Sequence, residues 1–171
     1  MISRANRGRA LERLIEISNA AYRRQGRAVV HKIPTAWLPL RDGRGRIVSA
    51  KVEQKAVVDF LGVLAGGRAV AFDAKQNREA TRFPLDGRWG HEVEFIRGVM
   101  AAGGIGFLIV EQVARDRIYL VPGALLIELW DEAQSGGRRS IPLSVLETCP
   151  VVGSAPGIPV DWLTALERTG A

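Results

Sequence analysis

Apolar and polar residues follow one another along the chain with periods that predict both helices and strands. Between about Arg7 and Arg24 the apolar residues recur every three or four positions, which predicts an amphipathic first helix. A strand is expected from Ala28 to Ile33, where Pro34 ends it. The helical period returns between His91 and Ala102 and predicts a second helix, which two glycines terminate.

Strand-like segments fill the middle of the chain. Residues Ala56–Leu64 and Arg68–Lys75 are separated by Ala65-Gly66-Gly67, a spacing typical of an antiparallel hairpin. Thr81–Arg88 has no clear period and is expected to be a loop. The uniformly apolar segment Ile105–Val110 predicts a buried strand of the same sheet.

The last third continues the alternation of strands and helices. Arg117–Val121 is expected to be a strand, and a helix is expected from Pro122 to about Glu132. Gly136–Arg139 is a basic turn, and a short final helix is expected at Asp161–Arg168. This order of elements predicts an α/β chain.

Length and composition narrow the class of protein. The 171 residues are 47% apolar, which predicts one globular domain spanning residues 1–171. Cys149 is the only cysteine, which excludes an intramolecular disulfide framework and a cysteine-rich zinc site. Apolar runs fall far short of the roughly 20 residues of a membrane span, and the arginine-rich start lacks the apolar core of a secretory signal. We therefore expect a cytoplasmic protein with no membrane association.

Positive charge is concentrated in the first third of the chain. Residues 1–60 contain 13 Lys or Arg and 5 Asp or Glu, a balance of +8, whereas residues 61–171 contain 11 and 13, a balance of −2. A one-sided basic surface attracts nucleic acid, although a surface that only maintains solubility has the same composition. Within this third, the glycine-punctuated segment Arg41–Arg46 has apolar flanks and predicts a projecting hairpin with a cationic tip.

The second strand of the expected central hairpin carries candidate catalytic chemistry. Asp73 and Lys75 are two residues apart, so their side chains share one face and are open to a site, while Phe72 faces the core. Asp59 is expected on the partner strand, near Asp73. Two carboxylates suit Mg²⁺, which activates water for phosphodiester hydrolysis, and a lysine orients or deprotonates that water. From spacing alone, a surface ion pair worth about 0–1 kcal/mol is the commoner explanation of Asp-x-Lys.

Short motifs in a fixed order extend over nearly the whole chain. They are Asn6-Arg7-Gly8 with Glu12, His31-Lys32, Pro34-Thr35, Asp59-Phe60-x-Gly62, Phe72-Asp73-Ala74-Lys75, Phe83-Pro84-Leu85, His91-Glu92, Gly137-Arg138-Arg139-Ser140-Ile141 and Ala155-Pro156. In this order they resemble the RecU Holliday junction resolvases. The resemblance implies the restriction-endonuclease-like PD-(D/E)xK fold, in which helices flank a mixed sheet. It also implies a homodimer that nicks opposing strands of four-way DNA junctions with Mg²⁺ or Mn²⁺.

The resemblance further implies roles for individual residues. Asp59 and Asp73 correspond to metal ligands, and Lys75 corresponds to the catalytic lysine. Glu92 matches a metal-binding position that is Gln in relatives, so metal affinity is expected to differ here. Val57 stands near a position where the family has a hydroxyl residue, which makes the geometry beside Asp59 an open question.

Glu12, in the first helix, matches an acidic residue that the family uses near the metal site. The resemblance therefore implies a catalytic role for it. A helix-surface carboxylate beside Arg9 or Arg13 is the alternative that the residues alone leave open.

The resemblance also implies a stalk-like insertion, at about residues 36–50, that enters the centre of the junction. Arginine side chains bind phosphate oxygens without reading sequence. The residues expected to contact DNA are Arg7, Arg9, Lys32, Arg41, Arg44, Arg46 and Lys51. For Lys51 the alternative is a solvated charge at a strand edge.

Three other functions remain as alternatives. A nuclease of the same superfamily without junction selectivity would keep the metal site, and an architectural junction-binding protein would keep only the basic hairpin. An RNA-binding module is less favoured, because aromatic residues are only 6% of the chain and none is interleaved with the arginines. A recombinase or a branch-migration motor is a conceivable protein partner of a junction-cleaving enzyme.

Overall fold

A five-stranded sheet with the order β1-β4-β5-β7-β8 forms the centre of the computed structural model, which describes residues 4–54 and 56–170. Its strands are β1 (Ala28–Lys32), β4 (Phe60–Leu64), β5 (Ala69–Asn77), β7 (Ile105–Gln112) and β8 (Arg117–Pro122). β5 and β7 run parallel, and the other neighbours are antiparallel. The expected α/β architecture with a mixed sheet is therefore confirmed.

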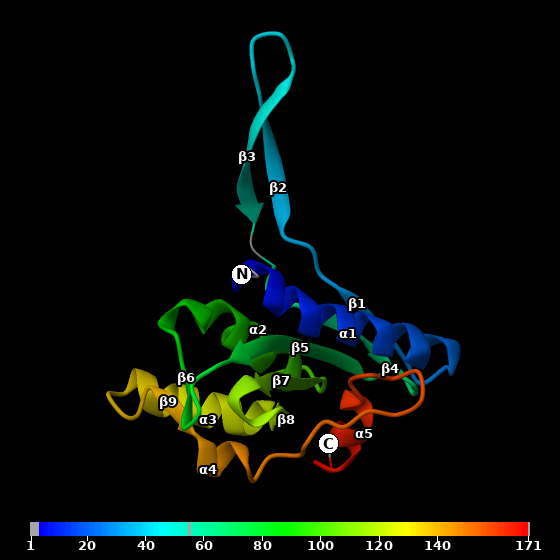
Figure 1. The fold of residues 1–171 in the computed structure, drawn as a ribbon, viewed down its shortest axis with the longest axis vertical. Coiled ribbons are helices and arrows are strands. Elements are labelled where there is room, and N and C mark those ends of the chain that lie inside the picture. The colour runs from blue at the N-terminus through cyan, green and yellow to red at the C-terminus, as the bar shows by residue number, and fades with distance from the viewer. Residues whose placement is uncertain (1–3, 55, 171) are drawn as a thin grey trace.

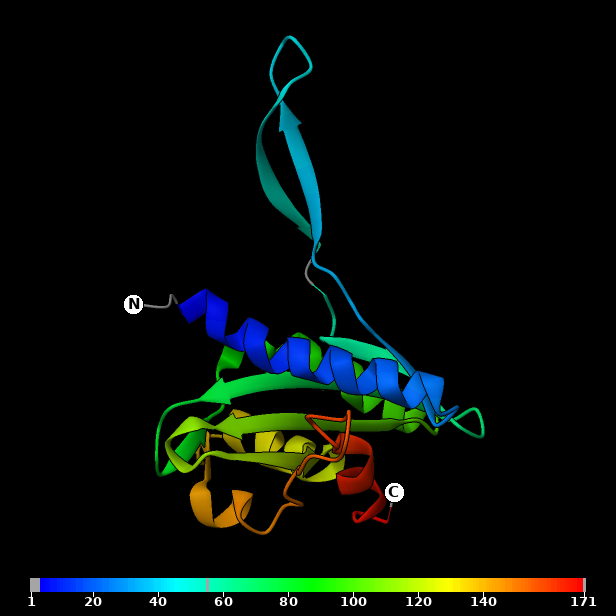
Figure 2. The ribbon, with the colours of Figure 1, turned by 45° about the vertical axis from the view of Figure 1, so that its right-hand side comes forward.

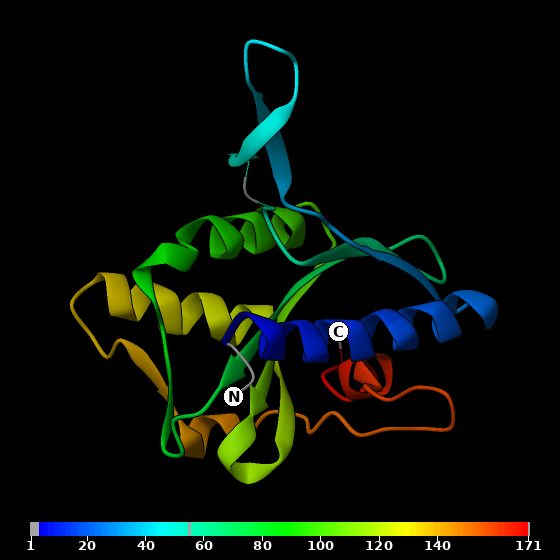
Figure 3. The same cartoon turned by 45° about the horizontal axis from the view of Figure 1, so that its top comes forward.

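Helices cover both faces of this sheet (Figures 1 and 3). The long helix α1 (Arg4–Arg24) and the short C-terminal helix α5 (Trp162–Glu167) pack on one face. The helices α2 (Gly90–Ala101) and α3 (Gly123–Gln134) pack on the other. All four were expected from the sequence. None of the helices in the described ranges combines the length and the hydropathy of a membrane span.

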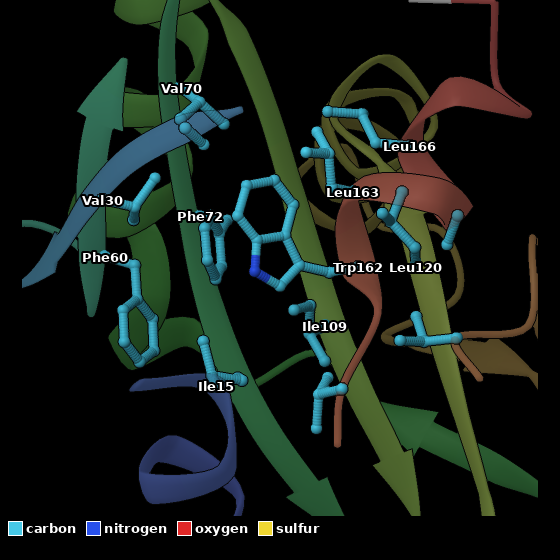
Figure 4. Packing of buried hydrophobic residues seen from close by; sticks show 14 of the residues in the cluster. Ile15, Val30, Phe60, Val70, Phe72, Ile109, Leu120, Trp162, Leu163 and Leu166 are labelled. Carbon is cyan, nitrogen blue, oxygen red and sulfur yellow. The ribbon is translucent and has the colours of Figure 1, made fainter. Parts of the chain in front are cut away.

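An aromatic cluster anchors β5 beneath α1 and α5 (Figure 4). The ring of Phe72 stacks between those of Phe60 and Phe107, with centroids 4.9 Å and 4.5 Å away. Trp162 lies against Phe72 at 5.1 Å, and its indole Nε1 donates a hydrogen bond of 2.9 Å to Asn19 Oδ1 on α1. These rings fix the position of β5, and therefore of the polar residues that follow Phe72.

Gly62 in β4 sits where β1 passes too close for any side chain. A Cβ at this position would lie 2.1 Å from the carbonyl oxygen of Val29 and 2.6 Å from the Cα of Val30. Both atoms belong to the backbone, so neither can rotate away. We expect Gly62→Ala to lower the free energy of unfolding by about 2–3 kcal/mol, as overpacking of a core does, in urea denaturation monitored by circular dichroism.

Gly98 provides the matched control, because a Cβ there meets nothing within 4 Å on an exposed part of α2. Gly98→Ala is expected to be neutral or to stabilise the protein by up to about 1 kcal/mol, since alanine is the better helix former. Equal stability of the two variants would contradict the proposed close approach of β1 and β4.

A two-stranded hairpin, here called the stalk hairpin, stands clear of the sheet and its helices (Figures 1 and 2). It consists of β2 (Ala36–Arg41) paired with β3 (Ile47–Gln54). Asp42 shapes the tip, since its Oδ1 accepts hydrogen bonds from the backbone N–H groups of Arg44 and Arg46 at 2.9 Å and 3.0 Å. The prediction of strands on both sides of the basic turn is confirmed.

Sequence periodicity was wrong about one short region and gave no expectation for two others. Thr81–Arg88 was expected to be a loop, but it contains the strand β6 (Arg82–Pro84), which pairs with β9 (Ser140–Pro142), and the start of a 3-10 helix at Gly87–Trp89. A second short helix, α4 (Leu143–Leu146), follows β9, and a 3-10 turn at Val113–Arg115 joins β7 to β8. Three residues are too few to display a period, so only their pairing across the chain reveals these strands.

Candidate active site

The two strands of the central hairpin differ in length, and this creates the site. Phe60 begins β4 and lies opposite Phe72, whereas β5 continues to Asn77. The expectation that Asp59 lies within a strand starting at Ala56 is therefore wrong: Asp59 occupies a bend just before β4. Among the described residues, no strand pairs with β5 on this side beyond Phe72, so its backbone groups there are open to other contacts.

Asp59 and Asp73 are held together by two reciprocal hydrogen bonds. The N–H of Ala74, which the missing strand leaves free, donates to Oδ2 of Asp59 at 2.9 Å. The N–H of Asp59 in turn donates to Oδ1 of Asp73 at 3.0 Å. Asp73 is only 2% exposed, so the expectation of an open side chain is wrong for this residue. The expected convergence of the two carboxylates is confirmed.

Lys75 is surrounded by groups that attract a cation. Its ammonium forms an ion pair with Oδ2 of Asp73 and lies 3.4 Å from Oε1 of Glu92, near the start of α2. The ring of Trp89 faces it at 5.2 Å from Nζ to the centroid, a cation–π distance. Asp73 and Lys75 share a face, as alternation along the strand predicted.

A cleft of about 540 Å³ gives access to these groups. Glu12, Asp59 and Lys75 line one part of it, and Arg78 and Glu79 line the part beyond the end of β5. α1 thus brings Glu12 to the cleft, where it forms an ion pair of 2.5 Å with Lys32. Glu12 is therefore a cleft residue and not a remote carboxylate on the helix surface.

The negative charges of the site perturb one another. Burial, reinforced by the carboxylate of Asp73, raises the pKa of Asp59 to about 7. Burial also disfavours the ammonium of Lys75, but the carboxylates of Asp73 and Glu92 reverse this effect and hold the pKa of Lys75 above its ordinary value. The carboxylates of the site therefore favour a proton on Asp59 and the charged form of Lys75.

The raised pKa of Asp59 predicts a pH dependence of stability for the metal-free protein. Between about pH 4 and pH 7 the unfolded chain has released this proton and the folded chain has not, so rising pH lowers the free energy of unfolding. We expect this slope in urea denaturation in EDTA, and we expect Asp59→Asn to flatten it. An Asp59→Asn protein with the same slope as the wild type would contradict the assignment.

The donor set fits a hard divalent cation. The described residues contain no preassembled cluster of three or more His, Cys, Asp or Glu side chains arranged for a metal. Mg²⁺ needs only one or two carboxylates, with water and phosphate oxygens as its other ligands. Among the described residues, no hydrogen-bond donor reaches the buried atoms Oδ2 of Asp73 and Oε2 of Glu92. The first forms an ion pair with Lys75, and the second lies 3.4 Å from Nδ1 of His91. Asp59 and Asp73, with Glu92 on the other side of Lys75, therefore offer oxygen ligands of the kind that a divalent metal binds.

Val57 lies in the bend before Asp59 and packs, partly buried, against the core on the α2 side. Its side chain has no oxygen that could bind a metal. The carboxylate of Glu92 instead adds negative charge on the other side of Lys75. Among the described residues of this bend, the carboxylate of Asp59 and the backbone carbonyl groups can still bind a metal.

The basic residues predicted to contact DNA occupy different environments. At the tip of the stalk hairpin, Arg46 forms an ion pair of 3.0 Å with Asp42, and Arg41 Nη1 donates to the carbonyl of Gly45 at 2.8 Å. Arg44 is exposed there, with its side chain in neither contact. Two of the three tip arginines thus also maintain the shape of the turn.

The other predicted DNA contacts are more widely spread. Lys51 is exposed on β3, and Lys32 at the end of β1 is engaged with Glu12. Arg7 and Arg9 lie in the first turns of α1, and their side chains lie outside the described part of the structure. The structure therefore pairs Lys32 with Glu12, a residue of the cleft, and leaves Lys51 with the tip arginines on the stalk hairpin.

Sequence reasoning missed three residues in or beside the candidate site. Trp89 packs on Phe83 at 5.1 Å and faces Lys75, and Gln76 donates a hydrogen bond of 2.7 Å to Glu111 on β7. Arg78 follows directly after β5. The position of Arg78 just beyond Asp-x-Lys was a usable signal, whereas nothing local to Trp89 indicated its neighbour.

Known proteins resemble this chain over most of its length. Residues 6–168 match a family described as Recombination protein U, RecU. Proteins named Holliday junction resolvase RecU are 32% identical in Oenococcus oeni, over 95% of this chain and 85% of that protein, and 36% identical in Geobacillus thermodenitrificans, over 96% and 84%. The solved structure of Hjc, a Holliday junction resolvase from Archaeoglobus fulgidus, aligns with 80% of this chain and 92% of its own at 14% identity and a TM-score of 0.47. With a family match of this extent and relatives at this identity, the chain belongs to the RecU family.

Proposed function

We propose that this protein is a structure-selective endonuclease that resolves four-way DNA junctions in recombination and repair, as one nuclease domain with a protruding stalk. The observation that carries the proposal is the convergence of Asp59, Asp73 and Lys75 beside one cleft, in a protein that also carries a projecting basic hairpin (Figure 1). Membership of a family whose curated members are named Holliday junction resolvases supports the choice of substrate. With DNA as its substrate, the enzyme would act in the cytoplasm.

The carboxylates of Asp59 and Asp73, together with Glu92, would hold Mg²⁺, with Mn²⁺ able to substitute. The metal would lower the pKa of a bound water and offset negative charge on the phosphate. The hydrogen bonds from Ala74 to Asp59 and from Asp59 to Asp73 orient both carboxylates before any metal arrives. Such preorientation lowers the cost of assembling the site.

Lys75 would direct its ammonium at the scissile phosphate. Its present partners, Asp73 and Glu92, are the carboxylates that would hold the metal, and the ammonium would then be available to an oxygen of the substrate. There it can orient the attacking water and stabilise the charge that develops in the transition state. Glu12, at the same cleft, is placed to hydrogen-bond that water from the α1 side.

Two features of the stalk hairpin support junction binding by a homodimer. Its tip presents Arg41, Arg44 and Arg46, and arginines bind phosphates without sequence readout. Its strands expose Ile47 and Val48 at 60% and 64%, although an isolated two-stranded hairpin is marginally stable in water. A second copy would cover these apolar residues and supply the second cleft that paired nicks require.

Cleavage of a labelled immobile four-way junction, compared with a linear duplex of the same sequence, tests the proposal. We expect paired nicks in the junction with Mg²⁺ or Mn²⁺, no cleavage in EDTA, and little cleavage of the duplex. Equal cleavage of both substrates would instead identify a nuclease without junction selectivity. Tight junction binding without cleavage in either metal would identify an architectural protein.

A further inference from the structure

The cleft extends beyond Asp59 and Lys75 to Arg78, an arginine that has no part in the proposed function. Arg78 is the first residue after β5, is exposed, and lines the same cleft as Asp59 and Lys75. Within residues 4–54 and 56–170, Arg78 forms no ion pair within 4 Å, whereas the neighbouring Glu79 is paired with Arg82 at 2.7 Å. The guanidinium of Arg78 is therefore available to an anionic ligand in the cleft.

The turn that carries Arg78 is fixed by the buried amide of Asn77, which is 6% exposed. Its Oδ1 accepts from the N–H of Glu79 at 3.2 Å, and its Nδ2 lies 2.6 Å from the carbonyl oxygen of Arg82 and 2.7 Å from Oε1 of Gln112. These contacts tie the turn both to β6 and to β7. Arg78 is thus displayed on a rigid support, which reduces the entropy lost when it binds.

The spacing along β5 indicates which group Arg78 would meet. Arg78 is three positions after Lys75, about 10 Å of extended chain at roughly 3.3 Å per residue. If Lys75 binds the phosphate that is cut, beside the proposed metal ligands, Arg78 would therefore lie next to the adjacent phosphodiester of the same strand. A guanidinium fork suits two oxygens of a phosphodiester.

We propose that Arg78 binds the phosphodiester adjacent to the one that is cut, and that Asn77 is a positioning residue acting through Arg78. This inference rests on the proposed nuclease function of the cleft. It adds a DNA contact on the body of the protein, separate from those of the stalk hairpin. Because every DNA has such a phosphodiester, the contact serves affinity and register and not junction selectivity.

Binding in EDTA, measured by fluorescence anisotropy over a series of NaCl concentrations, tests the contact on a junction and on a linear duplex. We expect Arg78→Ala to weaken binding about tenfold and to reduce the slope of log affinity against log salt by about 0.9, the value for one lost phosphate contact. Arg78→Lys should restore the slope, which a merely structural role would not do. Arg68→Ala is the control, since Arg68 is an exposed arginine at the opposite end of β5.

A slope unchanged in Arg78→Ala, or lowered equally in Arg68→Ala, would overturn the inference. For Asn77, the double variant Asn77→Ala/Arg78→Ala should bind no more weakly than Arg78→Ala, because the two residues act as one unit; additive losses would overturn its positioning role. The duplex separates this inference from the proposed function. A wild type that binds both DNAs without preference refutes junction selectivity but still reports the Arg78 contact.

Discussion

Lys75→Ala is expected to lower the rate of junction cleavage by about 10²–10³-fold or more, the loss typical when a preorganised electrostatic group is removed from an active site. Junction affinity should change little, because Lys75 is buried among carboxylates while the basic tip of the stalk hairpin is exposed. Single-turnover cleavage with saturating protein measures the chemical step, and anisotropy in EDTA measures binding.

Lys75→Arg distinguishes charge from geometry at this position. It keeps the positive charge but replaces a compact ammonium by a planar guanidinium, which must fit between Asp73, Glu92 and the ring of Trp89. We expect it to recover only part of the lost rate. Cleavage by Lys75→Ala within tenfold of the wild-type rate would remove Lys75 from the mechanism.

Asp73→Asn is expected to abolish detectable cleavage and to weaken Mn²⁺ binding by more than about 100-fold. Changes to residues that only support a metal ligand already cost about 10–100-fold, and here a proposed ligand loses its charge. The fold should persist, because the amide oxygen of asparagine can still accept the hydrogen bond from the N–H of Asp59. Isothermal titration with Mn²⁺ measures the affinity, and circular dichroism checks the fold.

Glu94→Gln is the matched control for this experiment. Glu94 is an exposed carboxylate on α2, two residues after Glu92, and it pairs with Arg97 at 3.4 Å and not with the site. It should bind Mn²⁺ and cleave junctions as the wild type does. Equal Mn²⁺ affinity in Asp73→Asn and Glu94→Gln would show that Asp73 does not bind the metal.

Features that depend on neighbouring residues along the chain could be predicted from the sequence alone. The 3.6-residue period identified α1, α2 and α3, and the two-residue period placed Asp73 and Lys75 on one face of β5. Glycines and charges marked the tip of the stalk hairpin. These properties follow from backbone geometry and local turn chemistry, and a short window of sequence contains both.

The contacts that surround the candidate site depend on how distant elements pack together, and they became visible only in the folded structure. Because β4 starts at Phe60, Asp59 lies outside the strand and accepts a hydrogen bond from the N–H of Ala74. Packing of α1 and α2 on the sheet brought Glu12 to the cleft and Trp89 to Lys75. These contacts join residues tens of positions apart, and local periodicity carries no information about which distant elements pack together. The sequence therefore identified the candidate catalytic groups, while the packing of helices on an incomplete sheet edge determined their burial, their partners and their position at the cleft.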